Sequence, residues 1–391
     1  MRYLDETLTD LAETKLVLLT GPRQVGKTTI AEHWLKGRRG IYLNYDVPED
    51  RDVILRREFI DPVRYDAVVL DEIHKFARWK TLLKGVVDQR RHTMKMVVTG
   101  SARLDVFQRG GDSLLGRHEY LCLHPFSVGE LLHGKLLPPP ANWLTPGDYA
   151  GGKKTEKLWQ RLANRSGFPE PYTKNDTKQH QRWSLRRRSL LVRDDLRELS
   201  QIRELSLVEH LAMLLPARVG SPLSINSLRE ELSVAHDTVS SWIETLERLY
   251  YCFRISPYSA RIGRSVRKEK KLYLWDWSVI ESPSARFENM VASHLLKAIH
   301  GWTDVGFGEF DLCYFRDRDS NEVDFVITEK RKPIAILECK KSDTSPSKPL
   351  LRLARELHMI PAIQLVELPN IDRTDAHFRV VSAHHYLANF P

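Results

Sequence analysis

The sequence has few cysteines and no long apolar run. In 391 residues there are four cysteines, too far apart for a disulfide framework or a zinc site of closely spaced thiolates: Cys122, Cys252, Cys313 and Cys339. The first residues, MRYLDETLTD, contain no apolar signal core, and no apolar stretch is long enough to cross a bilayer. We therefore expect a cytoplasmic protein with reduced thiols and no membrane partner.

The composition shows no sign of disorder, but the charge is unevenly distributed. Hydrophobic residues make up 42% and charged residues 28%, as in ordinary soluble proteins. Lys and Arg outnumber Asp and Glu by 24 to 15 in residues 136–275, against 22 to 19 before and 14 to 17 after this segment. A local positive excess is expected where a polyanion binds. The middle of the chain is therefore a candidate DNA-binding region.

A phosphate-binding loop follows the apolar run that begins at Leu16. The segment fills every fixed position of the pattern G-x-x-x-x-G-K-[ST] and precedes a helical stretch. In such loops the backbone N–H groups surround the phosphates, Lys27 reaches the β and γ oxygens, and Thr28 holds Mg²⁺. We expect ATP and Mg²⁺ as cofactors, with the nucleotide bound by Gly21, Pro22, Arg23, Gln24, Val25, Gly26, Lys27, Thr28 and Thr29.

A second short apolar run, residues 67–70, ends in Asp71 and Glu72, as expected for a buried parallel strand with a Walker B motif. In that role Asp71 binds Mg²⁺ and Glu72 polarises the attacking water. A third run, residues 96–99, leads to Thr99 and Ser101, which are candidates for the sensor of the γ-phosphate.

Three arginines follow the sensor run, and one of them is a candidate arginine finger: Arg103, Arg109 and Arg117. The strand-like segments number five, at residues 16–20, 40–45, 67–70, 96–99 and 120–123. Their alternation with helical or loop lengths predicts an α/β domain of the doubly wound, parallel-sheet type. We expect four regions: an ATPase domain at 1–135, a helical connector at 136–205, a winged helix-turn-helix domain at 206–280 and a C-terminal α/β domain at 281–391.

The winged-helix prediction rests on the order of elements between residues 224 and 275. A short helix (Ser227–Leu232), a longer helix (His236–Arg248), a strand, a basic loop and a closing strand (Leu272–Trp275) follow one another. Apolar residues recur at helical spacing and should form its core: Leu228, Leu232, Val239, Trp242, Ile243 and Leu246.

Basic residues gather in a predicted helix and in the loop. The candidates for contacts with DNA phosphates are Arg186 and Arg187 in the helix, and Arg261, Arg264, Arg267 and Lys268 in the loop. The second helix instead exposes acidic and small residues such as Asp237 and Glu244, so we expect little direct reading of bases.

The C-terminal region carries acidic residues in the arrangement of metal-dependent nucleases. Asp324 lies on a predicted strand, and the next strand ends in Glu338-Cys339-Lys340. Glu338 and Lys340 are two residues apart and point to one face of the sheet, where Asp324 can join them. Asp324 and Glu338 are thus candidate metal ligands, with Lys340 beside the attacking water. Glu288, in a helical stretch, is a further candidate acid.

The chain resembles a large bacterial and archaeal family of ATPases with an AAA-like N-terminal domain and a C-terminal region of unassigned function. The resemblance covers nearly the whole length and rests on TGPRQVGKTT, VVLDEIHKFARWKTLLKGVVD, VVTGSARL, SLLGRHEYLCLHPFSVGEL, SGFPEPY, LVRDDLREL, KLYLWD, EVDFVI and ILECKK. It implies a P-loop ATPase, a winged-helix middle and a terminal domain similar to PD-(D/E)XK nucleases, with Glu288, Asp324, Glu338 and Lys340 at the matching catalytic positions.

Three functions are compatible with these features. The first is an ATP-hydrolysing enzyme that processes DNA with a Mg²⁺-dependent nuclease domain. The second is an ATP-driven DNA remodeller, a branch-migration or helicase-type motor, whose C-terminal domain binds DNA without cutting it. The third is a nucleotide-gated switch that binds protein. For each of them we expect a homo-oligomer.

Overall fold

The computed structural model describes the chain except for residues 91–93, 101–115, 148–151, 192–195, 197–203 and 260–268. Two compact units are present. The N-terminal unit contains Met1–His124 and Gly134–Leu136, and the C-terminal unit contains Pro125–His133 and Leu137–Pro391. Among the described residues, no helix is both long and apolar enough to span a membrane.

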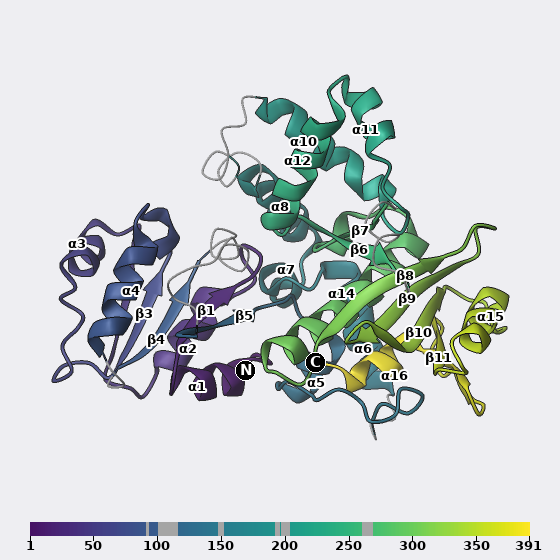
Figure 1. Ribbon diagram of the computed structural model, residues 1–391, viewed down its shortest axis with the longest axis horizontal. Coiled ribbons are helices and arrows are strands. Elements are labelled where there is room, and N and C mark those ends of the chain that lie inside the picture. The colour runs from purple at the N-terminus through teal and green to yellow at the C-terminus, as the bar shows by residue number, and fades with distance from the viewer. Residues whose placement is uncertain (91–93, 101–115, 148–151, 192–195, 197–203, 260–268) are drawn as a thin grey trace. The chain divides into compact units, whose positions relative to one another are not determined.

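The N-terminal unit is built on a five-stranded sheet with the order β2-β3-β4-β1-β5, in which all paired strands are parallel (Figure 1). This confirms the α/β prediction, and the strands begin and end within two residues of the predicted limits. The strands are β1 (Leu16–Thr20), β2 (Gly40–Asn44), β3 (Ala67–Asp71), β4 (Lys95–Thr99) and β5 (His118–Cys122). The helices are α1 (Asp5–Ala12), α2 (Lys27–Leu35), α3 (Pro48–Arg56), α4 (Trp79–Arg90) and the 3-10 turn η1 (Ile73–Lys75).

Both faces of this sheet are covered, which explains why its central strands are uninterrupted apolar runs. Every residue of β1 and β3 is buried. Leu16 and Leu18 face one side and pack with Ile54 of α3 and Leu83 of α4. Helices α1 and α2 also contact the sheet, and their buried residues are not part of that core cluster. A strand buried on both faces loses the alternation of polar and apolar residues.

The C-terminal unit combines helices with a second sheet (Figure 1). Its helical part follows the predicted helix–turn–helix–strand order, and all six residues of the predicted apolar core are buried. The first helices are α5 (Val128–His133), α6 (Lys153–Arg165), α7 (Pro169–Lys174), α8 (Thr177–Leu190), α10 (Leu205–Leu214), η4 (Leu215–Arg218), α11 (Ile225–Leu232) and α12 (His236–Arg248). The later ones are η5 (Trp277–Val279), α14 (Pro283–Asp304), α15 (Lys348–Glu356), α16 (Ala383–Tyr386) and η6 (Leu387–Asn389).

The second sheet has eight strands in the order β12-β13-β11-β10-β9-β8-β6-β7. Its strands are β6 (Cys252–Pro257), β7 (Lys271–Leu274), β8 (Phe310–Arg316), β9 (Glu322–Glu329), β10 (Lys332–Lys340), β11 (Ala362–Val366), β12 (Asp372–Thr374) and β13 (Phe378–Ser382). β6 pairs antiparallel with β7 and parallel with β8. The strand pair that follows α12 therefore belongs to the same sheet as the C-terminal strands.

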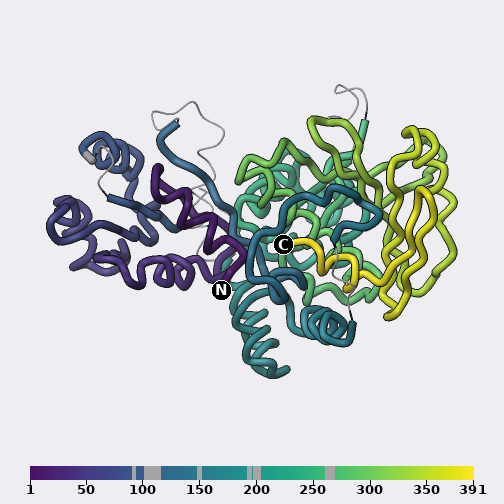
Figure 2. The backbone as a smooth tube through the Cα atoms, turned by 90° about the horizontal axis from the view of Figure 1, so that it is seen from below, coloured from purple at the N-terminus to yellow at the C-terminus, as the bar shows by residue number. Residues whose placement is uncertain are grey.

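Buried polar contacts attach the segment Pro125–His133 to the long helix α14. The ammonium of Lys297 is ion-paired with Glu130, donates to Ser127 Oγ at 2.9 Å and donates to the carbonyl of Pro125 at 3.1 Å. A Cβ on Gly129 would lie 1.6 Å from the carbonyl oxygen of Phe390, so the C-terminal residues pack directly on α5 (Figure 2). Residues 125–133 of the predicted first region, 1–135, therefore belong to the C-terminal unit, whereas 134 and 135 belong to the N-terminal unit.

Lys297→Met should lower the free energy of unfolding by about 3–5 kcal/mol, because the buried Glu130 then loses the ammonium with which it is ion-paired. The double variant Lys297→Met/Glu130→Gln should recover part of this loss. Lys174→Met is the control, because Lys174 forms an exposed pair with Glu170 and should change stability by less than about 1 kcal/mol. Chemical denaturation measures all three, and equal losses in the two single variants would contradict the prediction.

Candidate nucleotide site and acidic cluster

The phosphate-binding loop connects β1 to the first turn of α2, as predicted. Gly21 and Gly26 have φ angles of 127° and 100°, and Gln24 has a φ angle of 64°. Gly21 also has no room for a side chain, since a Cβ there would lie 2.3 Å from the carbonyl oxygen of Leu123. The loop conformation therefore requires glycine at its first fixed position, through both backbone angle and space.

Lys27 and Thr28 are the first two residues of helix α2, and the side chain of Thr28 contacts Asp71 at the end of β3. Lys27 is buried and its ammonium donates to the carbonyl oxygens of Gly21 and Pro22, each at 2.9 Å. The Thr28 hydroxyl donates to Asp71 Oδ2 at 2.8 Å. A hydroxyl and a carboxylate at this separation are the oxygen ligands that suit Mg²⁺ at a phosphate loop, so the residues present fit the expected cation.

Asp71 is the centre of a hydrogen-bond network at the end of β3. Its Oδ2 also accepts a hydrogen bond from the Tyr42 hydroxyl at 2.6 Å, and its Oδ1 accepts from the Thr99 hydroxyl and from the backbone N–H of Glu72. Burial and the neighbouring Asp71 carboxylate raise the pKa of Tyr42, which therefore keeps its proton and remains a donor. Side chains of β2, β4 and α2 thus hold this carboxylate in one orientation.

Glu72 points differently from Asp71 because its backbone adopts a left-handed conformation with a φ angle of 57°. Its Oε2 lies 3.5 Å from His74 Nε2 and 3.7 Å from Lys75 Nζ. Burial and the charge of Asp71 raise the pKa of Glu72, while the charges of Lys75 and Lys27 oppose this shift. A carboxylate with a raised pKa beside a phosphate loop suits the role of general base.

The other predicted nucleotide contacts are not all brought to this site. Thr99 lies beside Asp71, as described above, whereas Ser101, Arg103 and Arg109 are outside the described residues. Arg117 directly precedes β5 and so lies at the amino ends of the parallel strands, whereas the phosphate loop follows the carboxyl end of β1. Its guanidinium is ion-paired with Asp88. The structure therefore does not bring Arg117 to the nucleotide site of its own chain.

Arg2 is a residue at this site that sequence reasoning missed. Its guanidinium donates to the carbonyl oxygen of Val25, in the phosphate loop, at 2.6 Å and to that of His124 at 2.5 Å. A single arginine near the start of the chain carries no pattern, so nothing in the sequence pointed to it. Tyr42, the donor to Asp71, was also missed, because a single tyrosine in a strand forms no recognisable motif.

The C-terminal unit brings together the four residues predicted for a nuclease site. Asp324 lies on β9, Glu338 and Lys340 lie on β10, and Glu288 lies on α14. The ammonium of Lys340 is 2.7 Å from Glu338 Oε1, and the backbone N–H of Asp324 donates to Glu338 Oε2 at 3.3 Å. These side chains therefore lie together, whereas their role in catalysis stays a prediction.

The structure adds a lysine that was not predicted. Lys271 of β7 is fully buried, and its ammonium lies 2.9 Å from Asp324 Oδ1, 2.8 Å from Glu288 Oε1 and 2.7 Å from Glu322 Oε1. We call Glu288, Glu322, Asp324 and Glu338 the acidic cluster. No sequence pattern distinguishes Lys271, because it is the last of several closely spaced basic residues.

The charges of the acidic cluster depend strongly on one another. Burial and the charge of Asp324 raise the pKa of Glu288 to about 8 and that of Glu338 to about 7. Burial lowers the pKa of Lys271, but Tyr273 and the surrounding carboxylates raise it by more, so the ammonium stays charged. The carboxylates of the cluster are therefore paired with the ammonium groups of Lys271 and Lys340 and are not an open set.

The two predicted DNA-binding groups have different outcomes. Arg186 is exposed on α8 and available to a polyanion. Arg187 is 4% exposed, and its guanidinium lies 4.2 Å over the ring of Phe168, so the prediction of a surface phosphate contact is wrong for this residue. The remaining candidates, Arg261, Arg264, Arg267 and Lys268, are outside the described residues.

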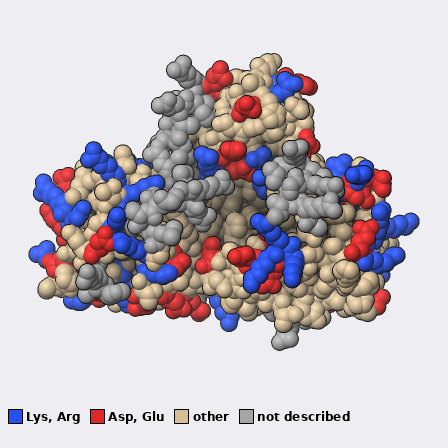
Figure 3. Space-filling view, in the orientation of Figure 1, with Lys and Arg blue, Asp and Glu red and all other residues tan. Residues whose placement is uncertain are grey.

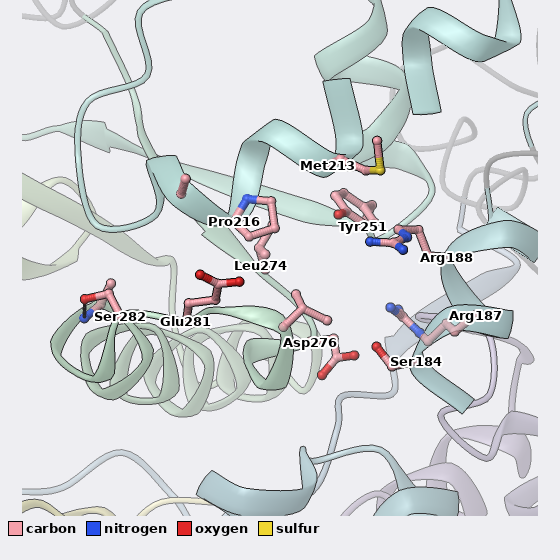
Figure 4. A pocket seen from close by; sticks show the side chains of 13 residues that line it. Ser184, Arg187, Arg188, Met213, Pro216, Tyr251, Leu274, Asp276, Glu281 and Ser282 are labelled. Atoms are coloured by element: carbon pink, nitrogen blue, oxygen red, sulfur yellow. Dashed lines mark hydrogen bonds between the residues drawn. The ribbon is translucent and has the colours of Figure 1, made fainter. Parts of the chain in front are cut away.

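Arg187 instead lines a pocket of about 470 Å³ in the C-terminal unit. Ser184, Arg187 and Arg188 project into it from α8, opposite Glu281 and Ser282 (Figure 4). On the face drawn in Figure 3, basic and acidic side chains are interspersed among the described residues. DNA contacts on the described part of that face would therefore involve separate basic residues and not one continuous basic surface.

Comparison with known proteins assigns a family to the N-terminal region. Residues 13–132 match the family model described as "AAA domain". Residues 156–284 match "Domain of unknown function (DUF8612)", and residues 284–386 match "Domain of unknown function (DUF4143)". The middle and C-terminal regions thus match families without an assigned function.

Two mycobacterial proteins are similar over most of the chain. "Uncharacterized protein Rv2008c" of Mycobacterium tuberculosis (strain ATCC 25618 / H37Rv) and "Uncharacterized protein Mb2031c" of Mycobacterium bovis (strain ATCC BAA-935 / AF2122/97) are each 21% identical over 346 residues. Each match covers 85% of this chain and 72% of the relative.

Two solved structures are similar at low sequence identity. A point variant of Thermotoga maritima RuvB is 18% identical, with a TM-score of 0.30 over 64% of this chain and 88% of that chain. The STAND protein PH0952 of Pyrococcus horikoshii, with a tetratricopeptide repeat sensor, is 13% identical, with a TM-score of 0.23 over 77% of this chain and 47% of that chain. At such scores these similarities carry no argument about function. The family match and the geometry at Lys27, Thr28 and Asp71 agree, and residues 13–132 are an AAA-family P-loop ATPase domain.

Proposed function

We propose that this protein is an ATPase that acts on DNA, contacts it mainly through the phosphate backbone and does not cut it. The observation that supports the ATPase part is the contact between Thr28 and Asp71, two side chains that would contribute oxygen ligands to Mg²⁺ beside the phosphate loop. The DNA part is supported by the excess of Lys and Arg in residues 136–275.

In the proposed reaction each residue of the nucleotide site has one task. The ammonium of Lys27 binds the β- and γ-phosphates, and the backbone N–H groups of the loop surround them. Thr28 and Asp71 would hold Mg²⁺, which supplies positive charge where negative charge develops on the phosphates. Glu72 accepts a proton from the attacking water. Thr99 keeps Asp71 oriented and is also a proposed sensor of the γ-phosphate.

The order of elements in the C-terminal unit supports the proposed domains. We propose a helical connector at 136–205, a winged helix-turn-helix at 206–280 formed by α11, α12, β6 and β7, and a nuclease-like domain at 281–391. Strands β6 and β7 also continue the sheet of the proposed nuclease-like domain, so the two regions share one sheet. We also propose a cytoplasmic homo-oligomer, in which Arg117, remote from the phosphate loop of its own chain, is a candidate arginine finger for a neighbouring subunit.

Metal-dependent cleavage of DNA is the second candidate function. It is favoured by the gathering of Glu288, Asp324, Glu338 and Lys340 on one side of the sheet. Remodelling without cleavage is preferred because Lys271 neutralises the centre of this group, where a nuclease needs open carboxylates.

Glu72→Gln should bind ATP with unchanged affinity and lower turnover by roughly 10²–10⁴-fold, because the amide cannot accept the proton of the attacking water. Lys27→Ala should instead lose most nucleotide affinity, because it contacts the phosphates in the ground state. Glu49→Gln, an exposed change on α3, is the control and should leave both quantities unchanged. A fluorescent nucleotide and a steady-state phosphate assay provide the measurements, and full turnover in Glu72→Gln would disprove the assignment.

The pH dependence of turnover should report the ionisation of Glu72. The residue acts as a base only when deprotonated, so activity falls as the pH decreases through its raised pKa. The charge of Lys75 opposes that rise, and Lys75→Met should therefore move the acidic limb of the kcat profile to higher pH. Profiles of the two proteins at saturating ATP make the comparison. An acidic limb that stays in place or moves to lower pH would mean that another group controls turnover.

DNA binding should weaken with salt, and the basic loop should account for part of this dependence. Replacing Arg261, Arg264 and Arg267 with Ala should reduce the slope of log affinity against log salt by roughly 0.9 for each lost phosphate contact. A charge-matched control replaces three exposed residues at the turn between β9 and β10: Lys330, Arg331 and Lys332. Filter binding across a salt series, with single-stranded, duplex and branched DNA, measures the slopes. Equal slopes in wild type and the loop variant would place the DNA surface elsewhere.

A further inference from the structure

The contacts of Lys271 satisfy its side chain completely. An ammonium group has three N–H donors and no acceptor. Its nitrogen lies within 2.9 Å of one oxygen on each of three carboxylates, from Glu288, Glu322 and Asp324. These residues come from α14 and β9, while Lys271 comes from β7. The ammonium therefore has no donor left over for a phosphate or any other ligand.

Asp324 and Glu338 have hydrogen-bond or ion-pair partners on both of their carboxylate oxygens. Asp324 Oδ2 accepts the backbone N–H of Cys339 at 2.9 Å. Glu338 uses one oxygen for Lys340 and the other for the backbone N–H of Asp324. Glu288 Oε1 accepts from the hydroxyl of Tyr273 at 2.7 Å in addition to Lys271. Each carboxylate of the acidic cluster thus accepts at least one hydrogen bond or ion pair from the protein, and Glu288 accepts two on Oε1.

A divalent cation at this position would meet two obstacles. It would have to approach the point where three carboxylate oxygens converge, which the ammonium of Lys271 occupies, and two cations in a buried site repel each other strongly. It would also have to displace donors that now hold Asp324 and Glu338. Without the ammonium, however, the same buried carboxylates would be uncompensated, which is costly unless another cation or protons replace it.

We propose that the ammonium of Lys271 is the resident cation of the acidic cluster, that the natural protein binds no divalent cation there, and that removing this ammonium creates a divalent-cation site. The proposal concerns a site remote in sequence from the phosphate loop and does not depend on ATP hydrolysis. It also gives a structural role to the cluster, since one side chain of β7 joins the acidic residues of β9 and α14.

Binding of Mn²⁺ to nucleotide-free protein, counted by electron paramagnetic resonance, tests the proposal. Lys271→Met should bind one more Mn²⁺ per chain than wild type, and the double variant Lys271→Met/Asp324→Asn should lose it again. Lys340→Met is the matched control, because it removes another ammonium from the same cluster without emptying its centre, and it should bind as wild type does. Mn²⁺ should also raise the melting temperature of Lys271→Met and leave that of wild type unchanged.

A second comparison remains decisive if Lys271→Met does not fold. Glu338→Gln leaves every ion pair of Lys271 intact, so in the wild-type background it should not change the number of bound Mn²⁺ ions. A lost ion in Glu338→Gln would show that wild type already holds a cation at the cluster and would overturn the proposal. It would also be overturned by a folded Lys271→Met that binds no additional Mn²⁺, or by Mn²⁺-dependent DNA cleavage by wild type that Asp324→Asn abolishes.

Discussion

The larger unit depends on buried lysines that are paired with carboxylates from distant parts of the chain. Lys271 joins β7 to β9 and α14, and Lys297 joins α14 to the segment that contains Glu130. An isolated buried charge is costly, whereas a pair with satisfied hydrogen bonds is tolerated and penalises any arrangement that separates its members. Helix α14 takes part in both groups, so its position is fixed at two places along its length.

In the nucleotide site, a single buried carboxylate, that of Asp71, is likewise held by several hydrogen-bond donors. Asp71 accepts hydrogen bonds from side chains on β2, β4 and α2, and from the backbone N–H that follows it. Neutral donors replace the lysines of the larger unit here, which leaves the negative charge of Asp71 available to a cation. The acidic cluster and the Asp71 site therefore differ in the source of the positive charge. Lysines of the protein provide it in the acidic cluster, and a bound ion would provide it at Asp71 in the proposed ATPase reaction.

Much of the fold could be predicted because each motif has a local physical signature. The phosphate loop needs glycine at Gly21 and Gly26, and strands buried on both faces are uninterrupted apolar runs, as at Val68 and Val97. Helices α11 and α12 follow from apolar spacing alone. Predictions about which charged residues face solvent were less secure, because arginine and lysine look alike in sequence whether they are exposed, as Arg186 is, or buried, as Arg187 and Lys271 are. Their partners lie far away in the chain, and a single sequence does not pair them.

The backbone of Gly21, in the phosphate loop, lies directly against the backbone of Leu123, which follows β5. Leu123 and His124 are the last residues of the N-terminal unit before the chain enters the segment held by Lys297, and the guanidinium of Arg2 joins His124 to Val25 of the phosphate loop. Strand β5 is paired with β1 along its whole length. The carbonyl of Leu123 leaves no space for Gly21 to shift toward it, so a change in the conformation of the phosphate loop has to be shared with the end of β5, next to one of the three points where the chain passes between the two units.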